Sequence, residues 1–98
     1  MASEHTKDAA GLLRALASEC RLRILCLLEN GERSVSELAK HLDLSQSSLS
    51  QHLARLRNGG IVTTRRDGVT IFYRIADQDA LSLAKALSVI VAKRRGGT

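Results

Sequence analysis

The sequence predicts an α+β fold that is mainly α-helical, and three patterns predict it. Two short helical segments, residues 35–42 and 45–58, are separated by a break of two residues. Two runs rich in β-branched residues follow a glycine pair, and helices with broad apolar surfaces lie near both ends of the chain. The resulting order is helix, helix, helix, helix, strand, strand, helix, which is a winged helix-turn-helix. We expect residues 1–98 to form one such domain with dimerising terminal helices.

Length and composition limit the classes of protein that remain. A chain of 98 residues supplies one modest core, and 44% hydrophobic with 26% charged residues is ordinary for a folded soluble protein. No apolar stretch approaches the length of a membrane span, and the N-terminus lacks the apolar core of a signal peptide. We therefore expect a cytoplasmic protein with no membrane partner. There is no phosphate loop, nucleophile motif or clustered acid–base set, so we expect no enzyme and no catalytic residue.

Two apolar helices are predicted before the paired short helices. The first covers residues 8–18 and places Leu12 and Leu16 on one apolar side. The second covers about residues 18–29 and has the broad apolar surface of a buried helix. An Asn-Gly pair ends it, because these residues adopt the left-handed conformation that a helix terminus often needs.

The first of the two short helices is predicted over residues 35–42. Ser34 precedes it and Glu37 lies three residues later, which is the spacing of a capping box. After the two-residue break, Ser45 is a favourable N-cap for the next helix.

That next helix, residues 45–58, has two different faces. Its leucines repeat at i, i+4 and i+7 and form one narrow apolar stripe. The opposite face carries short hydroxyl and amide groups instead of the Glu and Lys usual on a solvated helix. Such groups and Arg hydrogen-bond to base edges or phosphates, so the helix is predicted to read the DNA major groove. The predicted contact residues are Ser45, Gln46, Ser47, Ser48, Ser50, Gln51 and Arg55. A polar helix that only faces solvent is the alternative.

A β-hairpin is predicted after this helix. The β-branched runs 61–65 and 69–75 are separated by a short Arg-Asp-Gly turn. The Asp-Gly pair favours a tight turn with positive φ angles. Arg65 and Arg66 stand beside the turn, where we expect them to contact phosphates or the minor groove. An ordinary exposed turn with solubilising arginines is the alternative.

The last helix is predicted over about residues 78–93, with Asp77 as its cap. Its apolar set is too wide for one buried side, because Leu81 and Val89 lie outside the main stripe. A wet apolar surface of this kind is an aggregation hazard. We therefore expect a homodimer whose interface uses the first and last helices. The predicted interface residues are Leu12, Leu16, Leu83, Leu87 and Ile90.

The net charge of +5 is unevenly distributed. Residues 1–43 carry six Lys/Arg against seven Asp/Glu, residues 44–74 carry five against one, and residues 75–98 carry four against two. The cations therefore concentrate on the reading helix, the hairpin and the tail, as in nucleic-acid-binding proteins. One Phe, one Tyr and no Trp leave too few aromatic platforms for single-strand binding. Double-stranded DNA is the expected partner.

Three runs of sequence resemble the ArsR/SmtB family of bacterial winged-helix repressors: LLRALASECRLRILCLL, SVSELAKHLDLSQSSLSQHLARLRNGGIV and TRRDGVTIFYRI. Of these, LSQSSLSQHLARLR is the most specific part. The chain is most similar to the non-metal, NolR/HlyU/BigR-like branch. The resemblance implies homodimerisation through the terminal helices and repression that a signal relieves. It also implies that Gln46, Ser47, Ser50 and Gln51 face the major groove.

The metal sites of this family are not matched. Where one kind of sensor carries paired cysteines, residues 35–42 contain none. Where another kind uses Asp and His on the last helix, no His follows Asp77 or Asp79. The three histidines, which have no ligand spacing, are His5, His41 and His52. We expect no metal and no cofactor, and we expect His41 and His52 to lie on the surface or to contact phosphates.

Cys20 and Cys26 are the only thiols. Cys26 matches a second-helix cysteine of the redox-responsive branch, but the partner position on the last helix falls near Ala92, so the pair is broken. Within one helix the two thiols are too far apart for a disulfide. Buried packing residues are the favoured interpretation. The alternative is a thiol sensor, for which Cys20 is the better candidate because Arg21 and Arg23 favour thiolate.

The sequence thus predicts a sequence-specific, DNA-binding transcriptional regulator, a dimeric repressor on a palindromic operator. Two alternatives remain: a redox- or persulfide-responsive repressor that uses Cys20 or Cys26, and a helical module that binds a protein partner. The residues identify no inducer.

Overall fold

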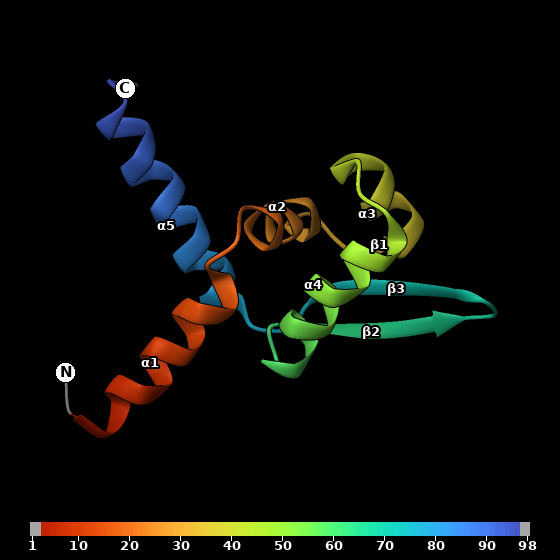
Figure 1. Ribbon diagram of the computed structural model, residues 1–98, viewed down its shortest axis with the longest axis horizontal. Helices are drawn as coiled ribbons and strands as arrows, with labels where there is room; N and C mark the ends of the chain where they lie inside the picture. The colour runs from red at the N-terminus through yellow and green to blue at the C-terminus, as the bar shows by residue number, and fades with distance from the viewer. Residues whose placement is uncertain (1–2, 97–98) are drawn as a thin grey trace.

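The computed structural model describes residues 3–96. In this part of the chain five helices and three strands follow one another: α1 Ser3–Leu16, α2 Glu19–Leu28, β1 Arg33–Ser34, α3 Val35–Leu42, α4 Gln46–Asn58, β2 Val62–Asp67, β3 Thr70–Ile75 and α5 Gln78–Arg94. Figure 1 shows α3, α4 and the β2–β3 hairpin on one side of the molecule, while α1 and α5 extend on the other. The predicted winged helix-turn-helix is confirmed.

The hydrophobic core lies where the helices meet the sheet. Leu25 of α2 and Leu38 of α3 are completely buried. The predicted leucine stripe of α4 is also inside: Leu49, Leu53 and Leu56 are exposed by 1% or less. Burying this stripe fixes which face of α4 remains available to a partner.

The turn between α3 and α4 follows from local chemistry. The Oγ of Ser34 accepts a hydrogen bond from the Glu37 amide at 3.1 Å, and the Glu37 carboxylate accepts one from the Ser34 amide at 3.0 Å. This is the predicted capping box. Asp43 ends α3 with φ +53°, a left-handed conformation that Asp and Asn tolerate better than most residues. Ser45 then caps α4, as predicted.

The hairpin belongs to a three-stranded antiparallel sheet in the order β1-β3-β2. The strand β1, in which Ser34 pairs with Phe72, was not predicted. Two residues are too few to show an alternating pattern, so β1 exists through its pairing and not through its own sequence. It attaches the start of α3 to the β2–β3 hairpin, which is the wing of this fold.

The hairpin turn lies one residue later than predicted. Asp67 is the last residue of β2 and pairs with Thr70, so Gly68 and Val69 form a two-residue turn. Gly68 has φ +63°, whereas neither Asp67 nor Val69 has a positive φ. Glycine at the first turn position suits a tight hairpin, and this leaves Val69 fully exposed at the tip.

The predicted bounds of the first helix were wrong at both ends. The helix α1 begins at Ser3 because the polar N-terminal residues, which show no apolar period, continue it. It ends at Leu16 because Ser18 belongs to the next helix, where its side chain accepts a hydrogen bond from the Arg21 amide at 3.2 Å. A serine that caps a following helix cannot also continue the preceding one.

The helix α5 changes character along its length. In its first half Ala80, Leu81 and Ala84 are buried beside α1 and α2. Leu81 was expected to lie outside the buried stripe, but the two packed helices cover more than one side of α5. Beyond this point one side of the helix borders α2 across an apolar groove, while Val89 and Val91 are 55% and 50% exposed.

Candidate nucleic-acid interface

The helix α4 presents a continuous polar face opposite its leucine stripe. All of the predicted contact residues on the helix are exposed: Gln46, Ser47, Ser48, Ser50, Gln51 and Arg55. At about 100° per residue, Ser47 and Gln51 point most directly outward, while Gln46 and Ser50 turn toward the hairpin. Ala54 lies in the middle of this face, and its small side chain lets another surface come close to the helix backbone.

Ser45 and Ser48 share a local role at the start of α4. The Oγ of Ser45 accepts a hydrogen bond from the Ser48 amide at 3.2 Å, and the Ser45 hydroxyl donates to the Ser48 Oγ at 3.2 Å. Both residues are exposed. Their hydroxyls are therefore partly committed to capping, and they are held in place at the edge of the polar face.

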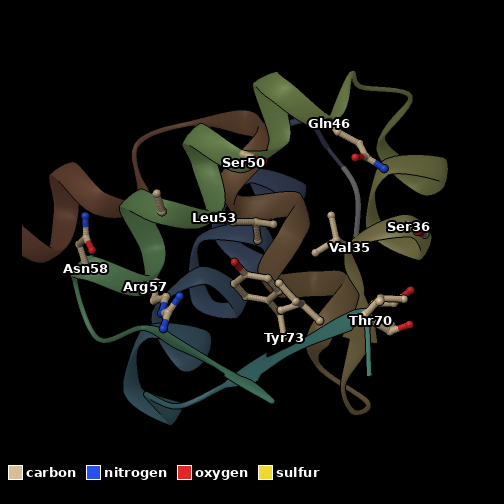
Figure 2. Close-up of a pocket in the computed structure, with 13 residues that line it drawn as sticks. Val35, Ser36, Gln46, Ser50, Leu53, Arg57, Asn58, Thr70 and Tyr73 are labelled. Atoms are coloured by element: carbon tan, nitrogen blue, oxygen red, sulfur yellow. The ribbon is translucent and has the colours of Figure 1, made fainter. Parts of the chain in front are cut away.

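A groove separates α4 from the wing. It has a volume of about 570 Å³ and lies between the start of α3, one side of α4 and strand β3. Figure 2 shows Gln46 above the groove, Ser36 and Thr70 at one end, and Arg57 at the other. The ring of Tyr73 forms part of the floor between these ends. Polar side chains thus surround an apolar base.

The two wing arginines lie on opposite faces of the sheet. Arg66 is paired with Ile71, on the same face as Tyr73, which lines the groove. It is exposed and has no ion pair within residues 3–96. Arg65 lies on the other face, where it binds both carboxylate oxygens of Glu32 and stacks 4.6 Å from the centre of the Phe72 ring. Only Arg66 therefore fits the predicted role of a free cation beside α4.

The contact between Arg65 and Glu32 shifts the pKa values of both groups. The hydrogen bonds from Arg65 lower the pKa of the Glu32 carboxyl below its ordinary value, and the same contact raises the pKa of Arg65. Glu32 immediately precedes β1, so this contact spans all three strands from β2 to β1. Arg65 therefore stabilises the wing on the face of the sheet opposite the groove.

His52 lies on the side of α4 that faces α2. Its Nδ1 is 3.2 Å from Nη1 of Arg21, whose Nε donates to the Ala15 carbonyl at 2.6 Å. A guanidinium can only donate, so the Nδ1 of His52 accepts. His52 is half-buried against α2 and so is less exposed than expected. His41 is exposed, as expected, with Nδ1 2.9 Å from the Glu37 carbonyl.

The predicted dimer residues fall into two groups. Leu87 and Ile90 are 38% and 46% exposed, and Leu12 and Leu83 are partly buried. Leu16, in contrast, is 2% exposed and belongs to the core, because the end of α1 packs against the helical body. The exposed leucine of α1 is Leu13, at 54%. A pattern of apolar residues in α1 did not reveal which of them the core uses.

The two thiols lie in different environments. Cys20 is partly buried, and this burial raises the pKa of its thiol despite the opposing effect of Arg23 and Arg21. It is therefore not the activated thiol that neighbouring arginines suggested. Cys26 is exposed instead of buried, and it shares an apolar surface groove with Ala92 of α5.

No three His, Cys, Asp or Glu side chains among residues 3–96 gather in an arrangement that could hold a metal ion. Within the same range no helix has the length and apolar character needed to cross a membrane.

Sequence reasoning missed Arg57 and Tyr73, which line the groove beside α4. Arg57 lies two residues after the predicted Arg55, but on the flank that faces the hairpin. Tyr73 looked like an ordinary strand residue. The alternation of Tyr73 with exposed Arg74 indicated only that its side chain points inward; the groove itself depends on how α3, α4 and β3 pack.

Comparison with known proteins matches this arrangement. Residues 18–64 match the family described as bacterial regulatory protein, arsR family. The chain is 45% identical over 84 residues to the transcriptional activator HlyU of Vibrio cholerae, covering 86% of this chain and 78% of that protein. It is 48% identical over 83 residues to the biofilm growth-associated repressor of Agrobacterium fabrum, covering 85% and 71%.

Solved structures of similar regulators have the same fold as this chain. The structure of HlyU from Vibrio cholerae has a TM-score of 0.84 at 43% identity, covering 91% of this chain and 97% of that one. The domain Mb0332 from Mycobacterium bovis, described as a homodimeric winged helix-turn-helix DNA-binding domain, has a TM-score of 0.79 at 32% identity, covering 95% and 89%. The fold that contains α4 is thus shared with known regulators. The chain belongs to the ArsR family of DNA-binding transcriptional regulators, in its non-metal branch.

Proposed function

We propose that this protein is a sequence-specific repressor that binds a palindromic operator as a homodimer. The observation that carries the proposal is the exposed face of α4, where Gln46, Ser47, Ser50 and Gln51 surround the small Ala54. Amides and hydroxyls of this length reach base edges only when the helix itself enters the groove. The free Arg66 on the adjacent wing supplies a cation for the phosphate backbone.

The dimer is supported by the second apolar face of α5. Leu87 and Ile90 stay exposed in the single chain, and Leu13 of α1 is exposed as well. Two chains joined through these helices would present two copies of α4. For a palindromic site the copies should be about 34–36 Å apart, one turn of the duplex.

Repression is the simplest consequence of such a complex. A dimer bound across a promoter excludes other proteins from the same DNA by occupancy alone, and it needs no additional contact with polymerase. The relatives include both an activator and a repressor by name, so an operator outside the promoter would lead to a different outcome. We place this function in the cytoplasm and assign no catalytic activity to the chain.

Selection of bound duplexes from a random pool tests the proposal, followed by fluorescence anisotropy with the selected duplex and a scrambled one. We expect a palindrome that binds about 10³-fold or more tighter than the scrambled duplex at physiological salt. Sedimentation should show a dimer. Equal binding of both duplexes would contradict sequence-specific recognition. No duplex binding at all would favour the helical protein-interaction module.

A further inference from the structure

The groove between α4 and the wing contains an unusual polar group. The residue Tyr73 is buried, with 9% of its surface exposed, and its hydroxyl makes no hydrogen bond with any residue from 3 to 96. No side-chain N or O atom in this part of the chain is both fully enclosed and without a partner. The hydroxyl must therefore open into the groove that the residue lines.

A cation without a counter-ion lies in the same groove. Arg57 is exposed and forms no ion pair with any described carboxylate. Figure 2 shows the Tyr73 hydroxyl directed toward α4, between Leu53 and Arg57. The nearest acid on α3, Glu37, does not line the groove, because its carboxylate is bonded back to the Ser34 amide. Arg57 and Tyr73 can thus both donate hydrogen bonds to an incoming anion.

We propose that Arg57 and Tyr73 form a phosphate seat that holds the DNA backbone between the base-reading face of α4 and strand β3 of the wing. The inference rests on the proposed function. The groove lies beside Gln46 and Ser50, so a duplex read by these residues brings one sugar–phosphate strand over it. A guanidinium and a phenol hydroxyl both donate to phosphate oxygens, and Arg does so in a bidentate manner. The seat fixes the register of α4 on the duplex without reading a base.

Two variants separate the contributions of the pair. Arg57→Ala should weaken binding of the selected duplex about tenfold and flatten the salt slope by about 0.9, the value for one phosphate contact. Tyr73→Phe keeps the buried ring and removes a neutral donor, so it should weaken binding about threefold with an unchanged slope. Arg74→Ala is the matched control, because Arg74 is exposed on the opposite face of the sheet and carries the same charge. It should change the affinity less than twofold.

A scan of the duplex with neutral methylphosphonates identifies the source of the phosphate. At one position in each half-site the substitution should weaken the wild type about tenfold but leave Arg57→Ala almost unaffected. Additive losses at every position, or equal effects of Arg57→Ala and Arg74→Ala, would overturn the seat while leaving DNA binding itself intact. Absence of any wild-type binding to the selected duplex would instead contradict the proposed function.

A free phosphate group is the competing source. Inorganic phosphate is therefore titrated against the complex at constant ionic strength, with chloride as the reference. We expect phosphate to displace no more DNA than chloride does, because one weak contact cannot compete with the whole interface. Phosphate that displaces the duplex from wild type but not from Arg57→Ala, without coupling in the methylphosphonate scan, would assign the groove to a small anion and overturn the duplex as its occupant.

Discussion

The helices α4 and α5 each bury one apolar stripe and expose the rest, yet their exposed surfaces differ in kind. On α4 the exposed side chains are short amides, hydroxyls and arginines, whereas the second half of α5 exposes Leu87, Ile90 and other aliphatic residues. A polar face loses little by staying in water, but an aliphatic face of this size gains from being covered. The two surfaces therefore require different partners: a hydrogen-bonding, anionic polymer for α4 and a second apolar helix for α5.

The largest expected effect tests the exposed aliphatic face of α5. Leu87→Glu places a carboxylate in the proposed interface, which should cost several kcal/mol of dimer stability and abolish tight operator binding. Because Leu87 is 38% exposed in the single chain, the variant should still fold. Sedimentation and anisotropy measure both effects, with Ser82→Glu on the same helix as the control. A Leu87→Glu protein that sediments and binds like the wild type would remove α5 from the interface.

The next effect concerns base reading by α4. Gln46→Ala, Ser47→Ala and Gln51→Ala should each reduce discrimination between operator and mismatched duplexes by about 1–3 kcal/mol where the side chain makes a good base-edge pair. Anisotropy against single-base variants of the operator measures this, and Gln78→Ala, an exposed glutamine outside the face, is the control. If all three variants discriminate as the wild type does, α4 is not the reading element.

The two wing arginines should differ, although the sequence treats them alike. Arg66→Ala should weaken every duplex to a similar extent and flatten the salt slope by about one unit. Arg65→Ala should leave the slope nearly unchanged, because Arg65 is already paired with Glu32 on the outer face of the sheet. Salt titrations of both variants decide the matter. A flattened slope for Arg65→Ala would mean that the ion pair opens when DNA binds.

A smaller effect appears in the pH dependence of stability. Because the pKa of Glu32 is lower in the folded protein than ordinary, its contact with Arg65 stabilises the fold above that ordinary value, and the contribution is lost as the pH falls through the folded pKa. The difference in Tm between wild type and Arg65→Ala should therefore be visible near neutral pH and shrink as the pH falls below the ordinary pKa of a glutamate carboxyl. Arg66→Ala, which removes the same charge, should show no such convergence. Parallel curves for Arg65→Ala down to acid pH would argue against the pair.

The smallest expected effect is at the thiols. The raised pKa of Cys20 keeps it mostly in the thiol form near neutral pH, so a thiol reagent should modify exposed Cys26 first. Cys26→Ser and Cys20→Ser should each change operator affinity by less than about twofold, and mild oxidation should leave chains of monomer mass. Intact mass under non-reducing conditions checks this. A covalent dimer that releases DNA until a reductant is added would instead make the protein a redox sensor.

The accuracy of the sequence predictions follows from how local each signal is. The capping box of Ser34 and Glu37, the leucine stripe of α4 and the cap of α5 depend on residues within one or two turns, and all three were predictable. The short strand β1 and the extra burial of Leu81 depend on neighbours distant in the sequence. Periodicity carries no information about such neighbours.

The same distinction applies to the candidate site. The polar face of α4 follows from helical spacing, so its exposure was predictable. The pairing of Arg65 with Glu32 joins residues far apart in the chain, and no local pattern separates Arg65 from Arg66. The groove with Arg57 and Tyr73 is similarly a product of three elements meeting. The environment of Cys20 depended on packing, which outweighed the nearby charges that the sequence displayed.

The left-handed backbone of Asp43 has a consequence for how this turn tolerates mutation. Its side chain is exposed, yet φ +53° and ψ +49° put the Cβ of most amino acids in conflict with the following carbonyl, at about 1–2 kcal/mol. Glycine, asparagine and aspartate suffer least from this handedness. Substitution at position 43 is therefore restricted by stereochemistry even though the side chain is exposed. A valine or isoleucine there would strain the turn between α3 and α4 without removing a core contact.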